Sequence, residues 1–234
     1  MEQVSYKSMY KSFLTLVRKS RVGTVHPEEF TDILNQAIDE VVDSKLSAME
    51  VNKTVYDDMA PLRVTKRDES MSEDDTDTYT SYICDIDKSG TNKGYRRIAA
   101  VSVTIGTVTN IKCHLLSSIE RTEVLGGYYS KPSMRKCYYE PLNALSVTSP
   151  NDPVQSLRIY VPKGTTSDVS CRYDIYKNPK PVLVSEVTSE NEYSEFSKSL
   201  SMHIVNVAAR IYLESIADSR YKSFLVEQQN KLNN

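Results

Sequence analysis

Hydrophobic side chains recur every three or four residues near the start of the chain, which is the spacing of one face of an α-helix. The first stripe predicts a short helix that ends before Gly23, with the members Tyr6, Met9, Tyr10, Phe13, Leu14 and Val17. A second helix is expected to begin at Pro27 and to continue to about residue 50, because proline suits a first helical turn. We expect the two helices to pack as a hairpin.

A third stripe with helical spacing lies near the end of the chain. It predicts a helix from about Glu195 to about Gln228, through Phe196, Leu200, His203, Ile204, Val207, Ala208, Ile211 and Tyr212. Because this helix is long and amphipathic, we expect it to pack against the N-terminal hairpin.

Between these helical ends the hydrophobic period changes from 3.6 to 2, which is typical of β-strands. The predicted strands are residues 79–86, 97–105, 111–116, 137–139, 157–161 and 171–176. Turns are expected at Gly90, Gly94, Gly106, Gly126, Gly127, Pro150, Pro153 and Gly164. Two short strands are also expected, one at Leu62 and Val64 and one at residues 182–184. The strands should pair antiparallel.

The segment from Asp68 to Asp77 interrupts this pattern, since six of its ten residues are acidic. Self-repulsion and a lack of apolar side chains predict a solvated loop, with a cation site as the alternative.

The order of helices, strands and helix predicts an α+β fold in which the N-terminal helical hairpin and the long C-terminal helix pack together around an inserted antiparallel β-rich domain. The expected divisions are residues 1–60 for the hairpin, 61–185 for the β-rich region and 186–234 for the C-terminal helix.

The composition narrows the class of protein. The 234 residues carry a net charge of −2, so the chain lacks the overall basic excess of a tight DNA binder. Its 16 tyrosines against 4 phenylalanines suit half-buried faces and subunit interfaces. No stretch approaches the length of a membrane span, and no apolar run of signal length is found at the N-terminus. We therefore expect a cytosolically made protein whose cysteines, Cys84, Cys113, Cys137 and Cys171, are reduced and mostly buried.

The best candidate for metal chemistry is the segment from Asp85 through Asp87 and Ser89 to Gly90, which is similar to the first half of a calcium loop. The closing position of such a loop requires a carboxylate, and Arg96 occupies it here. A polar hairpin turn is the main interpretation, and a weak metal contact stays open.

The remaining chemistry-bearing residues show no catalytic spacing. His26, His114 and His203 are isolated from one another, and the sequence contains no phosphate-binding loop, dinucleotide fingerprint or nucleophile elbow. We therefore expect no enzyme and no catalytic, cofactor-binding or metal site, although distant residues can converge in the fold.

Basic and aromatic side chains alternate in one segment, with Lys131, Arg135 and Lys136 among Tyr128, Tyr129, Tyr138 and Tyr139. Such a segment can stack on single-stranded nucleic acid, can be an ordinary tyrosine-rich loop, or can contact another protein.

Three stretches together resemble virion structural proteins of crAss-like and related short-tailed bacteriophages, in particular the connector and tail-ring proteins below the portal. They are VHPEEFTDILNQA at 25–37, YDIYKNPKPVLV at 173–184, and HIVNVAARIYLE at 203–214, followed by DSRY at 218–221. The resemblance covers both helical ends of the chain. The β-rich middle is similar to these proteins only in its general character.

The resemblance implies a ring, usually of twelve copies, that links the portal to the tail and lines the DNA passage. Its partners would be copies of itself, the portal or neighbouring tail-ring proteins, tail fibres, and passing DNA bound without sequence specificity. The chain would then be found in the virion, after assembly in the host cytoplasm. The alternatives are another tail or fibre-attachment protein of the virion, or a hydrolase whose site is assembled from distant residues.

Overall fold

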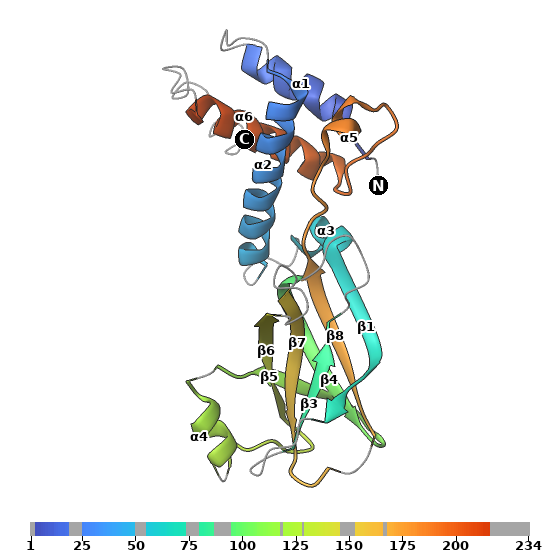
Figure 1. Cartoon of the computed structure of the whole chain (residues 1–234), viewed down its shortest axis with the longest axis vertical. Helices are drawn as coiled ribbons and strands as arrows, with labels where there is room; N and C mark the ends of the chain where they lie inside the picture. Colours follow the sequence, from blue (N-terminus) through green and yellow to red (C-terminus); the bar gives the residue numbers. More distant parts are fainter. Residues whose placement is uncertain are drawn as a thin grey trace. The chain divides into compact units, whose positions relative to one another are not determined.

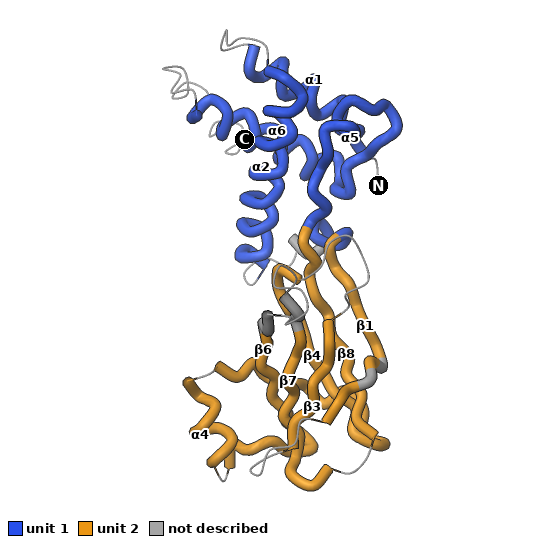
Figure 2. Tube along the Cα trace, viewed as in Figure 1, with its two compact units in different colours: residues 1–61, 179–234 blue, residues 62–178 orange. Residues whose placement is uncertain are grey.

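The computed structural model describes residues 3–18, 25–49, 55–73, 80–86, 95–117, 119–127, 129–145, 153–165 and 168–215 (Figure 1). The chain folds into two compact units (Figure 2). Residues 1–61 and 179–234 form a helical unit, and residues 62–178 form a sheet unit inserted into it. The predicted α+β class, with N- and C-terminal helices packed together and an inserted, mostly antiparallel sheet, is confirmed.

Three helices build the core of the helical unit: α1 (Tyr6–Arg18), α2 (Pro27–Ala48) and α6 (Lys198–Ser215). Both N-terminal helices pack on α6. The Phe13 ring joins all three, because its centroid lies 4.9 Å from that of Phe30 on α2 and 5.7 Å from that of Tyr212 on α6. The apolar stripes seen in the sequence are therefore the buried faces of this unit.

The last predicted helix begins later than expected, at Lys198 rather than near Glu195. The Ser197 hydroxyl accepts a hydrogen bond from the backbone N–H of Leu200, which is the contact of an N-terminal cap. The part of the prediction beyond Ser215 lies outside the described residues. None of the described helices is long and apolar enough to cross a membrane.

The strand predicted at residues 182–184 is wrong, since residues 178–183 have no regular structure and Val184–Thr188 form the short helix α5. The side-chain amide of Asn35 takes both backbone hydrogen bonds of Val182, accepting from its N–H at 2.8 Å and donating to its carbonyl at 3.0 Å. The Glu186 carboxylate accepts the N–H of Leu183. Side chains thus satisfy the backbone that a neighbouring strand would otherwise have paired.

The described residues of the sheet unit form eight strands in the order β1-β8-β4-β5-β6-β7-β3-β2. The strands are β1 (Arg63–Ser70), β2 (Ser72–Glu73), β3 (Thr80–Asp85), β4 (Tyr95–Ile105), β5 (Val108–Leu115), β6 (Cys137–Leu145), β7 (Pro153–Val161) and β8 (Val169–Lys177). All neighbours pair antiparallel except β5 and β6, which are parallel. The sheet curls around one apolar core, which contains all four cysteines as buried free thiols.

Several turn and loop predictions need correction. The acidic segment is not a loop throughout, because β1 runs to Ser70 and β2 follows at Ser72. Both are edge strands of the sheet, where charged side chains remain hydrated. Residues 74–79 lie outside the described part. Pro153 begins β7 instead of forming a turn, whereas Gly106 and Gly164 do form turns with positive φ.

Candidate interaction surface

The parallel pairing of β5 with β6 requires a long connection, and the chain supplies it with an excursion that the periodicity did not predict. We call residues 116–136 the α4 excursion, after the short helix α4 (Arg121–Gly126) that it contains. Figure 1 shows it to one side of the strands of its own unit.

A buried carboxylate anchors this excursion to the sheet. Glu140 on β6 accepts a hydrogen bond from the guanidinium of Arg121 in α4, and it accepts a second, at 2.8 Å, from the Tyr160 hydroxyl of β7. The Glu140 side chain is 9% exposed. The ion pair and the tyrosine together offset the cost of burying this charge.

Apolar packing and backbone hydrogen bonds hold the excursion on the sheet as well. Leu116 and Leu125 pack on the outward-facing rings of Tyr138 and Tyr160. The Tyr138 hydroxyl donates to the carbonyl of Ser130 at 2.7 Å, and the Ser130 hydroxyl donates to the Val124 carbonyl. The excursion is therefore a folded platform, not a loose loop.

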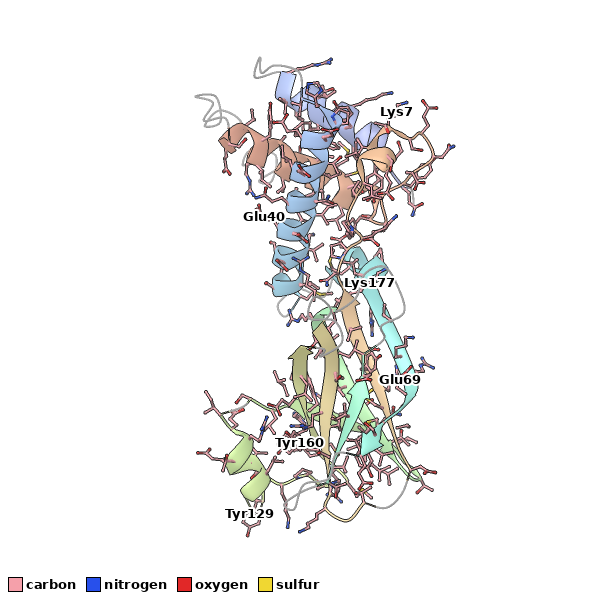
Figure 3. The ribbon with its side chains drawn as sticks, in the orientation of Figure 1. Lys7, Glu40, Glu69, Tyr129, Tyr160 and Lys177 are labelled. Atoms are coloured by element: carbon pink, nitrogen blue, oxygen red, sulfur yellow. The ribbon has the colours of Figure 1, made fainter. Side chains whose placement is uncertain are left out.

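Large apolar side chains are nevertheless exposed along it. Within it, Ile119 is 91% exposed, Tyr129 is 96% exposed and Met134 is 48% exposed, and Leu115, just before it, is 61% exposed. In Figure 3 Tyr129 projects away from the strands beside α4. A rigidly held segment that leaves several large apolar groups in water is typical of a docking surface.

Basic side chains accompany these apolar groups. The Lys136 ammonium lies 4.9 Å from the centre of the Tyr138 ring. Arg135, next to it in the sequence, and Lys112, on the paired strand β5, are both exposed. Partial desolvation and repulsion from Lys136 and Lys112 lower the pKa of His114, which favours the neutral form of its ring. Glu120 and Glu123 contribute the opposite charge, which leaves this surface mixed but on balance basic.

The structure narrows the interpretations of the predicted basic and aromatic segment. Tyr138 is buried beneath the excursion, and Tyr139 is buried in the sheet core, so neither ring can stack on a base. Tyr129 remains exposed, and Tyr128 lies outside the described residues. Two of the four tyrosine rings that were expected to stack on single-stranded nucleic acid are therefore buried.

The three histidines are not brought together. His26 is exposed at the start of α2, His203 is exposed on α6, and His114 belongs to the sheet unit. Partial burial, with the charges of Lys45 and Arg210, lowers the pKa of His203. Among the described residues, no group of three or more histidine, cysteine or acidic side chains is arranged to hold a metal ion.

The predicted turn after β3 is described only at its start. The Asp85 carboxylate accepts a hydrogen bond from the Ser156 hydroxyl of β7 at 2.7 Å, which fixes it at the end of the strand. Asp87, Ser89 and Gly90 lie outside the described residues, so the weak metal contact there stays a prediction.

Sequence reasoning did not pair the cysteines. Cys113 and Cys137 are register partners on the parallel strands β5 and β6; the Cys113 thiol donates to the carbonyl of Ile111, and the Cys137 thiol donates to that of Ser133. Cys84 on β3 and Cys171 on β8 belong to the same apolar core. Strand alternation assigns each cysteine to the inner face, but it carries no signal for which strands lie together.

Comparison with models of protein families finds no match for the chain, and comparison with curated proteins finds none either.

Proposed function

We propose that this chain is a virion structural protein that acts by docking, as a ring-forming subunit of the head-to-tail connector of a short-tailed bacteriophage. In this proposal its partners are further copies in a closed ring, twelve in number as is usual in the family it resembles, together with the portal or a neighbouring tail ring. It catalyses no reaction, and it lines a passage through which DNA moves without sequence-specific binding. Tail fibres would attach to its outer face.

The observation that carries the proposal is the α4 excursion. The chain uses a buried ion pair and a small apolar cluster to hold this segment firmly, and yet leaves Ile119 and Tyr129 almost fully exposed. Burying such side chains against a partner releases about 25 cal/mol for each Å² of apolar surface. A subunit that assembles with other proteins requires an exposed apolar surface of this kind for its partner to bury.

The resembling stretches also support the proposal, because the first, the third and the end of the second, from Pro179 on, belong to the helical unit. The first belongs to α2 and the third to α6, and these two helices pack on each other. The second is joined to the first through the two hydrogen bonds between Asn35 and Val182. The similarity therefore follows a packed structure and is not scattered along the chain.

A closed ring requires two different and complementary faces on each subunit. The excursion supplies one projecting face with apolar and basic side chains, which fits a neighbour's different surface better than a second copy of itself. The net charge of −2 is compatible with a wall along which DNA slides, since a strongly basic wall would retain the phosphates.

Purified virions test the proposal. Mass spectrometry should detect the chain as a stoichiometric component, and an electron-microscopy map should place its helical and sheet units in a ring between portal and tail. If the map instead places the chain in a fibre or at a fibre-attachment site, the chain is a different virion protein and not a connector subunit. Absence of the chain from the particle, or turnover of a substrate by the isolated monomer, would overturn the proposal.

A further inference from the structure

Large apolar side chains that remain exposed are concentrated on two segments of the chain. Among the described residues there are nine of them, and four belong to the α4 excursion or directly precede it. Three others lie close together in the sequence of the helical unit, Leu183 at 56%, Val184 at 39% and Tyr193 at 52% exposure. The chain therefore has a second candidate docking surface, residues 183–195, which we call the α5 segment because it contains α5.

Backbone hydrogen bonds hold the α5 segment on the helical unit. The N–H of Tyr6 donates to the carbonyl of Glu192 at 3.1 Å, and the N–H of Ser194 donates to the carbonyl of Val4 at 2.9 Å. The Val187 side chain of α5 is buried in the same unit. Like the α4 excursion, the α5 segment is thus a firmly held surface that exposes apolar side chains.

The two surfaces carry opposite charge. Residues 129–136 of the α4 excursion contain three basic side chains, all exposed, and no acidic one. The α5 segment contains four acidic side chains and no basic one. These groups are Lys131, Arg135 and Lys136 on the first surface, and Glu186, Glu190, Glu192 and Glu195 on the second.

Neighbouring lysines balance part of the acidic charge. Glu186 forms an ion pair with Lys180, and Glu190 forms one with Lys7. The segment nevertheless stays electronegative, because burial and the charges of three of its glutamates together raise the pKa of the Tyr6 hydroxyl. An approaching cationic surface would be attracted to it.

Each surface suits the other and not a copy of itself. Two α4 excursions placed together would bring basic side chains into contact, and two α5 segments would bring acidic ones into contact, which costs free energy. An α4 excursion against an α5 segment instead pairs opposite charges around apolar side chains, and that is the usual organisation of a protein interface. A contact between unlike faces also leaves each copy able to bind one neighbour on either side.

We propose that residues 129–136 of one copy dock on the α5 segment of the next copy. The apolar side chains of Tyr129 and Met134 contact those of the α5 segment, and Arg135 and Lys136 face its glutamates. Repeated from copy to copy, this contact closes a ring or extends a filament. The inference rests on the proposed function, because it names the two faces through which the subunits of that ring join.

Photo-crosslinking of the full-length chain tests the contact. Chain with p-benzoylphenylalanine in place of Tyr129 is mixed with wild-type chain labelled with heavy nitrogen, and the concentrated mixture is irradiated. Crosslinked peptides should join position 129 of the unlabelled chain to residues 183–195 of the labelled chain. Particles that contain the photoreactive chain should give the same link.

Charge reversal tests the pairing of the two faces with the same photoreactive group. Arg135→Glu and Glu192→Lys should each lower the yield of this crosslink about fivefold or more, because each places like charges across the contact. A chain with both substitutions should return to within about twofold of the unreversed yield, since the reversed faces are again complementary.

Glu28→Lys is the matched control. It makes the same change of net charge as Glu192→Lys at an exposed position of α2, and it should leave the yield within about twofold. Far-UV circular dichroism establishes that each variant is folded. The crosslink map of the chain without charge reversal decides the contact where a variant is not.

Crosslinks confined to a single chain, crosslinks between two α4 excursions, or crosslinks to nucleic acid would each overturn the proposal. So would a lack of crosslinks between copies in both concentrated solution and particles, or a double variant no better than the single ones. The outcome is separate from that of the proposed function. A chain that lies in a ring of the particle but crosslinks elsewhere removes this contact alone, whereas a chain that crosslinks as expected but is absent from particles removes the connector function alone.

Discussion

The guanidinium of Arg121 and the carboxylate of Glu140 form the ion pair that fastens α4 to the outer face of β6. The carboxylate is nearly buried, while about a third of the arginine side chain remains exposed. Removing the cation therefore leaves a nearly buried carboxylate that keeps its hydrogen bond from the Tyr160 hydroxyl.

We predict that Arg121→Ala lowers the free energy of unfolding by about 2–3 kcal/mol, because a buried carboxylate loses its counter-charge. Urea unfolding followed by far-UV circular dichroism measures this change. Arg135→Ala is the matched control, since Arg135 is exposed in the same excursion and should change stability by no more than about 0.5 kcal/mol. Equal stability of the two variants would show that the ion pair does not anchor α4.

The second prediction concerns Asn35, which satisfies both backbone groups of Val182. Asn35→Ala leaves these groups without their partner and should destabilise the protein by about 1–3 kcal/mol. Gln36→Ala is the control, because Gln36 is exposed on the same helix and alanine has the higher helix propensity. Thermal unfolding should show a lower midpoint for the first variant alone; an unchanged midpoint would contradict the role of Asn35.

The third prediction is a dependence of stability on acid pH. Burial of Asp174 acts to raise its pKa, but hydrogen bonds from Thr65 and Arg63, with the charge of Arg172, outweigh this and hold the pKa below its usual range. A folded-state pKa below the unfolded value of about 3.9 adds stability above that pH, and this contribution is lost as pH falls through the folded value.

Asp174→Asn should therefore lower stability near neutral pH and flatten the further loss between about pH 5 and pH 2. Urea unfolding across that range gives the comparison. Asp168→Asn, at an exposed position just before β8, should retain the wild-type slope. An Asp174→Asn variant that keeps the wild-type pH dependence would exclude this carboxylate as its source.

The fourth prediction tests the α4 excursion as a docking surface. Ile119→Asp should leave the free energy of unfolding within about 0.5 kcal/mol of wild type, because Ile119 is 91% exposed. It should nevertheless reduce incorporation of the chain into particles in a complementation assay. Val108→Asp, at a 40% exposed apolar position outside the excursion, serves as the comparison. Wild-type incorporation of the Ile119 variant would argue against this surface.

The sequence by itself determined the elements whose signals are local. The stripe through Met9 and Phe13, and Pro27 at the start of α2, depend on side chains a few residues apart, and the structure contains both helices. Strand alternation likewise located the middle strands and assigned the cysteines to buried positions. Periodicity reports which face of an element is buried, and that information is present in any short stretch of chain.

Only the tertiary structure decided which distant groups meet. Asn35 replaces a strand partner for Val182, which is far away in the sequence, and Glu140 turns an unpredicted excursion into a platform. Cys84 and Cys171 share one apolar core because the sheet curls, although four strands separate β3 from β8 in the sheet order. A hydrogen bond or ion pair between such groups depends on the path of the whole chain, and no local period of hydrophobic residues encodes that path.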